Sequence, residues 1–176
     1  EFFASLLKKD SIEAALKIIP FIDFECFKKP IEAVKGENSL MEIENELDNQ
    51  YYSGVLEFSK LLPRQGNLFR DFLMKEIEIR NLLAILKLKK AGIEKSKMRD
   101  FLFFTDDSAY KNLLEKLISS ELHAMPKFLE KNDYGEIIKE GFKSYEATGS
   151  LIELEASLYK YLLKKSILLL HLKCKR

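Results

Sequence analysis

The sequence predicts an all-α protein built from tandem helical-bundle repeats. Apolar residues recur at the three-to-four-residue spacing of amphipathic helices along nearly the whole chain. Glycine and proline are scarce, and several of them fall between these periodic segments, where helices end. No run of four or more residues alternates strictly enough to predict a strand. A chain that is 47% hydrophobic can also bury a real core.

The helical periodicity divides the chain into segments of unequal length. In chain order, the expected helices cover residues 2–9, 11–19, 24–35, 40–62, 68–91, 95–104, 108–119, 121–131, 134–145 and 151–172. Pro63 ends the long helix 40–62, because proline cannot continue a helix. Asn67 is the expected N-cap of the next helix and Gly92 its C-cap, since these residue types favour those positions.

One ten-residue phrase occurs twice. The stretches SLMEIENELD and SLIELEASLY share Ser, Leu, Glu, Glu and Leu at the same offsets, about 111 residues apart. Each begins with a capping box, formed by Ser39 with Glu42 and by Ser150 with Glu153. In such a box the serine accepts a hydrogen bond from the N3 amide, and the glutamate reaches back to the N–H of the cap. Convergence of two helix starts and duplication of a module explain these ten residues equally well.

The flanking sequence favours duplication. An aspartate followed by an aromatic residue precedes a short helix upstream of each copy, at Asp23 and at Asp133. Further upstream, each copy has two short helical pieces ending in proline, at Pro20 and at Pro126. The order of elements is therefore repeated together with the phrase. The length of the period indicates duplicated domains instead of a solenoid.

The segment FLMKEIEIRNLLAILKLKKAG, residues 72–92, is apolar on nearly all sides, which predicts a helix buried among its neighbours. Polar side chains inside such a helix need partners. The spacing pairs Glu76 with Arg80 and Glu78 with Asn81, and we expect these four residues to form a structural polar network. The last turns carry three lysines that either stay in solvent or contact an acidic partner: Lys87, Lys89 and Lys90.

Composition and motifs argue against several classes of function. The 29 basic and 28 acidic residues are interleaved, so no basic footprint for nucleic acid is expected. A surface rich in Lys and Glu fits either heat adaptation or an AT-rich genome. No GxGxxG or GxxxxGK[ST] motif predicts a phosphate site. Glutamates two apart on a helix diverge and form no catalytic pair. We therefore expect no catalytic, cofactor-binding or metal-binding residue.

The histidines and cysteines are expected to be structural. His123 borders a short helix and His171 lies near the end of the last one, and neither has converging metal ligands or catalytic partners. Cys26, between aromatic residues, is expected to be a small buried hydrophobic residue. Cys26 and Cys174 make no disulfide framework, which fits a reducing cytosol. The most apolar run, 166–172, is far shorter than the roughly 20 residues that span a bilayer.

The repeated phrase and the motif Glu-Ile-Glu-Ile-x-Asn-Leu at 76–82 resemble the C subunit of the archaeal and bacterial V/A-type rotary ATP synthase. Its eukaryotic counterpart is the d subunit of the vacuolar proton ATPase. The resemblance implies a curved or funnel-shaped all-helical fold in which one domain is repeated three times. About one and a half copies are expected here. Residues 1–92 are expected to form a first repeat, with or without its start, and residues 93–176 a second repeat, truncated at its C-terminal end.

The resemblance also implies a function in ATP synthesis and hydrogen ion transport. Members of this family are non-catalytic rotor parts of the central stalk, peripheral to the cytoplasmic face of the cell membrane. They couple stalk subunits D and F to the membrane proteolipid ring, so that ion translocation drives ATP synthesis or the reverse. They bind neither nucleic acid nor nucleotide directly. The alternatives are a helical-repeat scaffold for an unrelated protein partner and a helical hydrolase.

Overall fold

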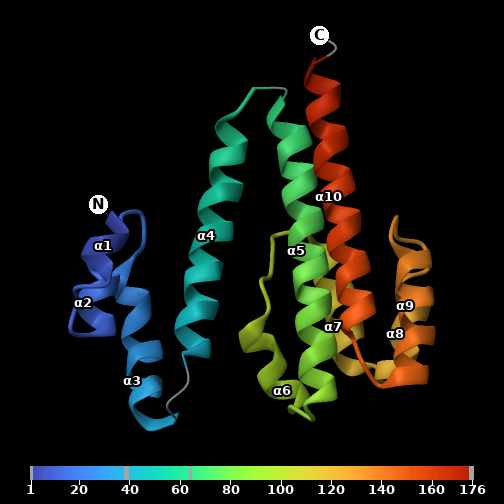
Figure 1. Ribbon diagram of the computed structural model, residues 1–176, viewed down its shortest axis with the longest axis horizontal. Coiled ribbons are helices and arrows are strands. Elements are labelled where there is room, and N and C mark those ends of the chain that lie inside the picture. Colours follow the sequence, from blue (N-terminus) through green and yellow to red (C-terminus); the bar gives the residue numbers. More distant parts are fainter. Residues whose placement is uncertain (1, 38–39, 64, 175–176) are drawn as a thin grey trace. The chain divides into compact units, whose positions relative to one another are not determined.

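The structure, a computed structural model, describes residues 2–37, 40–63 and 65–174. Every regular element in these ranges is a helix and none is a strand, which confirms the all-α fold class (Figure 1). The chain divides into two compact units, residues 1–58 (unit 1) and residues 59–176 (unit 2).

Unit 1 is built from short helices and most of one long helix. Its elements are α1 (Phe2–Leu6), α2 (Ile12–Leu16), the 3-10 helix η1 (Phe24–Phe27), α3 (Lys28–Glu37) and α4 (Met41–Leu61), of which α4 runs into unit 2. Ser11 caps α2 by accepting a hydrogen bond from the Ala14 N–H at 3.1 Å. Leu16, Phe27 and Ile43 form the buried core of this unit. The long helix α4 is therefore attached to the short ones through its N-terminal half, where Ile43 is buried and Leu47 packs against the core.

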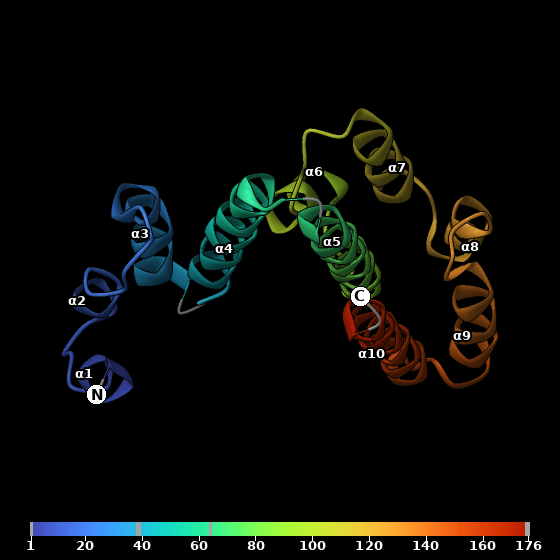
Figure 2. The same cartoon turned by 90° about the horizontal axis from the view of Figure 1, so that it is seen from above.

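Unit 2 contains two helices longer than α4, which are α5 and α10, and the shorter elements between them. They are α5 (Gln65–Lys90), α6 (Lys95–Met98), the 3-10 helix η2 (Arg99–Phe101), α7 (Ser108–Ser119), the 3-10 helix η3 (Leu122–Ala124), α8 (Met125–Leu129), α9 (Gly135–Thr148) and α10 (Ile152–Cys174). Helices α5 and α10 lie side by side and run antiparallel (Figures 1 and 2). Helix α9 packs against α10. No helix in the described part of the chain is long and apolar enough to cross a membrane.

Helix α5 is buried on most of its circumference, as its sequence predicts. Its buried apolar residues are all at most 3% exposed: Leu73, Ile77, Ile79, Leu82, Leu83, Ile85 and Leu86. The helix ends at Gly92, whose φ of 72° is the left-handed conformation that glycine adopts without strain. The Gly92 N–H donates to the Lys89 carbonyl and the Ile93 N–H to the Leu88 carbonyl, both at 3.0 Å. These two bonds form a Schellman motif, so the predicted C-cap is confirmed.

Two predictions about helix ends are wrong. Helix α5 begins at Gln65, so Asn67 lies inside its first turn and is not the N-cap. The chain turns earlier than expected, because the Gly66 N–H donates to the Pro63 carbonyl at 2.6 Å. Pro126 does not end a helical piece but lies in the first turn of α8. Proline suits that position, since a first-turn N–H has no partner within the helix.

The helix face shared by the two phrases is buried to different extents in α4 and α10. Ile43 and its counterpart Leu154 are 5% and 0% exposed. Further along, Tyr51 is 57% exposed, whereas its counterpart Leu162 is 8% exposed. The expected face is therefore buried along α10 but only at the start of α4.

Candidate functional site around helix α5

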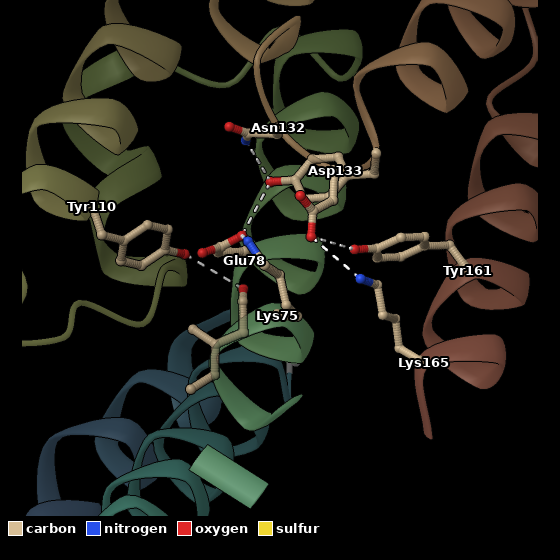
Figure 3. A network of polar contacts seen from close by, with 9 residues as sticks. Lys75, Glu78, Tyr110, Asn132, Asp133, Tyr161 and Lys165 are labelled. Atoms are coloured by element: carbon tan, nitrogen blue, oxygen red, sulfur yellow. Dashed lines mark hydrogen bonds and ion pairs between the residues drawn. The ribbon is translucent and has the colours of Figure 1, made fainter. Parts of the chain in front are cut away.

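Asn81 is the most deeply buried polar residue of the predicted network, at 1% exposure. Its side-chain amide donates to the Phe103 carbonyl at 2.7 Å, and its side-chain oxygen accepts from the Phe103 N–H at 3.0 Å. The same amide nitrogen lies 2.6 Å from the Tyr110 hydroxyl. Tyr110 in turn donates to the Ile77 carbonyl at 3.5 Å (Figure 3). Asn81 thereby joins α5 to α7 and to the segment that leads into it.

Glu78 faces a different set of partners from the one predicted. Its carboxylate accepts from Lys75 at 2.9 Å and from the buried Tyr134 hydroxyl at 3.4 Å. Tyr134 also accepts a hydrogen bond from the Asn132 side chain at 3.0 Å (Figure 3). The predicted Glu78–Asn81 pair is wrong, because Asn81 uses both ends of its amide on the Phe103 backbone. The Glu76–Arg80 pair stays a prediction. Burial lowers the pKa of the Arg80 guanidinium.

Asp133, in the loop between α8 and α9, ties this loop to α10. Its carboxylate lies 3.3 Å from the Lys165 ammonium and 3.5 Å from the Tyr161 hydroxyl (Figure 3). The hydrogen bond from Lys165 is the main reason why the pKa of Asp133 falls below its usual range. The next residue, Tyr134, packs edge to face on the Tyr161 ring, with 5.9 Å between ring centroids.

The two buried tyrosines of the network are held in their neutral form. Burial raises the pKa of Tyr110 and of Tyr134 well above the ordinary value. The Glu78 carboxylate raises the pKa of both hydroxyls further, since a nearby negative charge opposes their ionisation. Both therefore act as fixed hydrogen-bonding groups at neutral pH.

A cleft of about 540 Å³ opens beside this network. Its lining residues come mainly from α5 and α10: Leu68, Asp71, Phe72, Met74, Lys75, Glu78, Asp107, Asp133, Lys165 and Leu168. The part of the chain that the structure describes has no group of three His, Cys, Asp or Glu side chains able to hold a metal ion. The network therefore connects helices and presents charge, and it brings no nucleophile together with a general base.

The lysines that end α5 do not form a solvated tail. The Lys89 ammonium donates to the Ser120 carbonyl and to the Ile118 carbonyl, the latter at 2.8 Å. The Lys95 ammonium donates to the Ser119 carbonyl at 2.8 Å. These carbonyls lie at the C-terminus of α7, where a positive charge complements the helix dipole.

Two further lysines bind the hairpin between α9 and α10. Lys90 donates to the Gly149 carbonyl, just beyond the end of α9, at 2.6 Å. Lys87 forms an ion pair with Glu155, in the first turn of α10, at 2.7 Å. The predicted solvated tail is thus wrong, since these lysines bind groups within unit 2. Contact with an acidic partner stays a prediction.

The start of α10 is capped differently from the predicted capping box. The Ser150 hydroxyl accepts from the Ile152 N–H at 3.3 Å instead of the N3 amide, and the Ser150 N–H donates to the Thr148 hydroxyl at 3.2 Å. Glu153 instead accepts a hydrogen bond from the Ser144 hydroxyl of α9. The predicted box does not form, because the Ser150 N–H is bound to Thr148 and the Glu153 carboxylate to Ser144.

Two of the remaining predicted residues fall on exposed positions, and three fall outside the described part. Ser39 lies outside the described residues, and so do the side chains of His171 and Cys174. Glu42, the predicted capping-box partner of Ser39, is in the first turn of α4 and is exposed. His123 is exposed in η3.

The expected burial of Cys26 is wrong. Cys26 is exposed, and its neighbour Phe27 enters the core at 0% exposure. The 3-10 turn of η1 directs only one of these adjacent side chains inward.

Sequence reasoning missed several residues of the polar network around α5. These residues are Lys75, Tyr110, Asn132, Asp133, Tyr134, Tyr161 and Lys165. One signal was available for Asp133 and Tyr134. They precede the second copy by 17 and 16 residues, much as Asp23 and Phe24 precede the first by 16 and 15.

Comparison with known proteins identifies the relatives of this chain. The profile of a family described as ATP synthase (C/AC39) subunit matches residues 1–172. The C subunit of the A-type ATP synthase of Methanococcoides burtonii is 31% identical over 166 residues, which cover 94% of this chain and 45% of the relative. The same subunit of Methanosarcina barkeri is 28% identical over 173 residues, covering 97% of this chain and 47% of the relative. That of Methanocaldococcus jannaschii is 24% identical over 143 residues, covering 81% and 36%.

The chain spans about half the length, or less, of these curated relatives. No solved structure matches it. The match along residues 1–172, together with the all-helical fold, shows that the chain belongs to the ATP synthase (C/AC39) subunit family.

Proposed function

We propose that the chain is part of a non-catalytic coupling subunit of a rotary V/A-type ATP synthase. In this role it receives central-stalk subunits D and F and seats on the membrane proteolipid ring, at the cytoplasmic face of the membrane. It transmits torque between ion translocation and ATP synthesis or hydrolysis. The observation that carries this proposal is the family match over residues 1–172.

The packing of unit 2 supports a mechanical role. Helix α5 is buried along most of its length, and its polar residues bond to α7, to α10 and to the loops between them. Close-packed interiors are poorly compressible and transmit strain. A body of this kind passes force between partners with little deformation.

We further propose that residues 1–92 and 93–176 are two copies of one module. In the first, Gln50 on α4 bonds the Asp23 N–H at 2.7 Å and its carbonyl at 3.1 Å. In the second, Tyr161 on α10 bonds the Asp133 carboxylate at 3.5 Å. Gln50 and Tyr161 hold the same position relative to the repeated phrase. The compact units divide elsewhere, between residues 58 and 59, because α5 of the first proposed copy packs on α10 of the second.

Binding to purified partners tests the proposed function. The chain is immobilised and exposed to a D–F complex, to detergent-solubilised proteolipid ring and, as a control, to the catalytic head without its stalk. We expect binding to the D–F complex and to the ring but not to the control. Absence of binding to either the D–F complex or the ring would contradict the proposal, and binding of an unrelated protein partner in their place would favour a scaffold.

A further inference from the structure

The cleft beside α5 combines apolar walls with an open mouth. Leu68 and Leu168 line it and are 38% and 55% exposed, and Phe72 and Met74 provide further apolar surface. Exposed side chains of this size, grouped in a concavity, are typical of surfaces that receive another molecule. The walls therefore suit an occupant with an apolar component.

The charges in the cleft are not balanced. Lys75 pairs with Glu78 at 2.9 Å, and Lys165 pairs with Asp133 at 3.3 Å, which leaves these four residues neutral together. Two more carboxylates line the cleft, those of Asp71 and Asp107.

In the part of the chain that the structure describes, neither additional carboxylate has a basic partner. Within the described ranges, Asp71 and Asp107 form no ion pair with a lysine or arginine. Asp107 uses Oδ1 to cap α7, accepting from the Ala109 and Tyr110 N–H groups at 2.8 and 3.0 Å. Its Oδ2 and the Asp71 carboxylate remain for an outside donor, so the ten lining residues carry a net charge of about −2 at neutral pH.

We propose that the cleft is a docking site for a basic, apolar-flanked helix of the central stalk. An arginine or lysine of that helix binds Asp71 and Asp107, while its apolar neighbours cover Leu68, Phe72 and Leu168. Long basic side chains suit such a site, because their stems pack on apolar walls while their charged ends reach carboxylates. This inference rests on the proposed function, since it names the chemistry by which the stalk meets this chain.

The experiment compares charge reversals inside and outside the cleft. Asp71→Lys changes the cleft without touching the cap of α7, and Glu146→Lys makes the same change of charge on the exposed surface of α9. Binding of the D–F complex is measured for the unmodified chain and both variants, with circular dichroism to confirm folding. We expect Asp71→Lys to weaken binding about tenfold or more, because the new lysine would repel the basic residue of the stalk helix. Glu146→Lys should stay within about twofold.

The outcomes separate this inference from the proposed function. Equal effects of the two variants, or no effect of either, would overturn the docking site while leaving the function intact. If the unmodified chain does not bind the D–F complex, the function fails and a second probe still tests the cleft. That probe is a synthetic amphipathic helix carrying arginine beside leucine, compared with a twin carrying glutamate instead. Preference for the arginine peptide, abolished by Asp71→Lys, supports the site, and equal binding of the twins overturns it.

Discussion

The side chain of Asn81 binds Phe103 through both backbone polar groups of that residue, donating to its carbonyl and accepting from its N–H. The contact resembles one rung of a β-ladder made by a side chain. It fixes the segment between η2 and α7 against the central helix, although that segment has no regular structure of its own.

Replacing Asn81 by leucine should destabilise unit 2 strongly. The change keeps the volume but leaves the Phe103 N–H, the Phe103 carbonyl and the Tyr110 hydroxyl without this partner, at a cost of about 3 kcal/mol. Urea denaturation followed by circular dichroism measures the loss. Asn67→Ala is the matched control, since Asn67 is exposed and does not cap α5, and it should change stability by less than about 0.5 kcal/mol. Equal losses in the two variants would contradict the role of Asn81.

Lys89→Met should also destabilise unit 2, because the methionine keeps most of the apolar stem but has no ammonium group. The carbonyls of Ile118 and Ser120 then lose a charged donor, and we expect a loss of about 2 kcal/mol in the free energy of unfolding. Thermal and urea unfolding measure the change. Lys127→Met on α8 serves as the comparison, since Lys127 is exposed. If Lys89→Met lowers the free energy of unfolding no more than Lys127→Met does, the contacts of Lys89 with the end of α7 contribute nothing to stability.

Alkaline titration should separate the buried tyrosines from the rest. Burial raises the pKa of Tyr110 and Tyr134 in the folded protein, so the unfolded chain releases these protons first as the pH rises. Their contribution to stability is complete below the unfolded pKa of about 10 and is lost above it. Tyrosinate absorbance of native Tyr110→Phe and Tyr134→Phe variants should match that of the unmodified protein until unfolding begins. Loss of an early-titrating tyrosine in either variant would refute this.

Two helical glycines should respond in opposite directions to alanine. A Cβ at Gly141 of α9 would lie 2.9 Å from the Leu154 Cβ of α10, so Gly141→Ala should cost about 1–3 kcal/mol through overpacking. A Cβ at Gly54 of α4 would meet nothing within 4 Å, so Gly54→Ala should stabilise the helix by about 0.5–1 kcal/mol. Paired thermal melts measure both changes. The same sign at both positions would mean that the α9–α10 contact is looser than the structure indicates.

Sequence reasoning predicts the helices of this chain well, because their order follows from apolar spacing alone. The range 108–119 of α7 is reproduced to the residue, and Gly92 ends α5 as expected. Helix α5 begins earlier than its side chains indicate, because the Gly66 N–H donates a hydrogen bond to the Pro63 carbonyl. Because this bond joins two backbone groups, the types of side chain in the sequence do not predict it.

The candidate site was predicted only in part, since the partners of a buried polar residue come from distant sequence. Glu78 and Asn81 were identified from the rule that polar groups in an apolar helix need partners. Helical spacing suggested that they pair with each other. Tertiary structure instead offers Phe103 and Tyr110 to Asn81 and Tyr134 to Glu78, between 22 and 56 residues away.

The contacts of the last turns of α5 affect how unit 2 unfolds. Lys89 holds the end of α7, Lys90 the end of α9, and Lys87 the beginning of α10. Fraying that starts at any of these three ends removes a contact on which the same stretch of α5 depends. Opening is therefore cooperative across the unit, because no helix joined to this stretch can melt alone without weakening its neighbours.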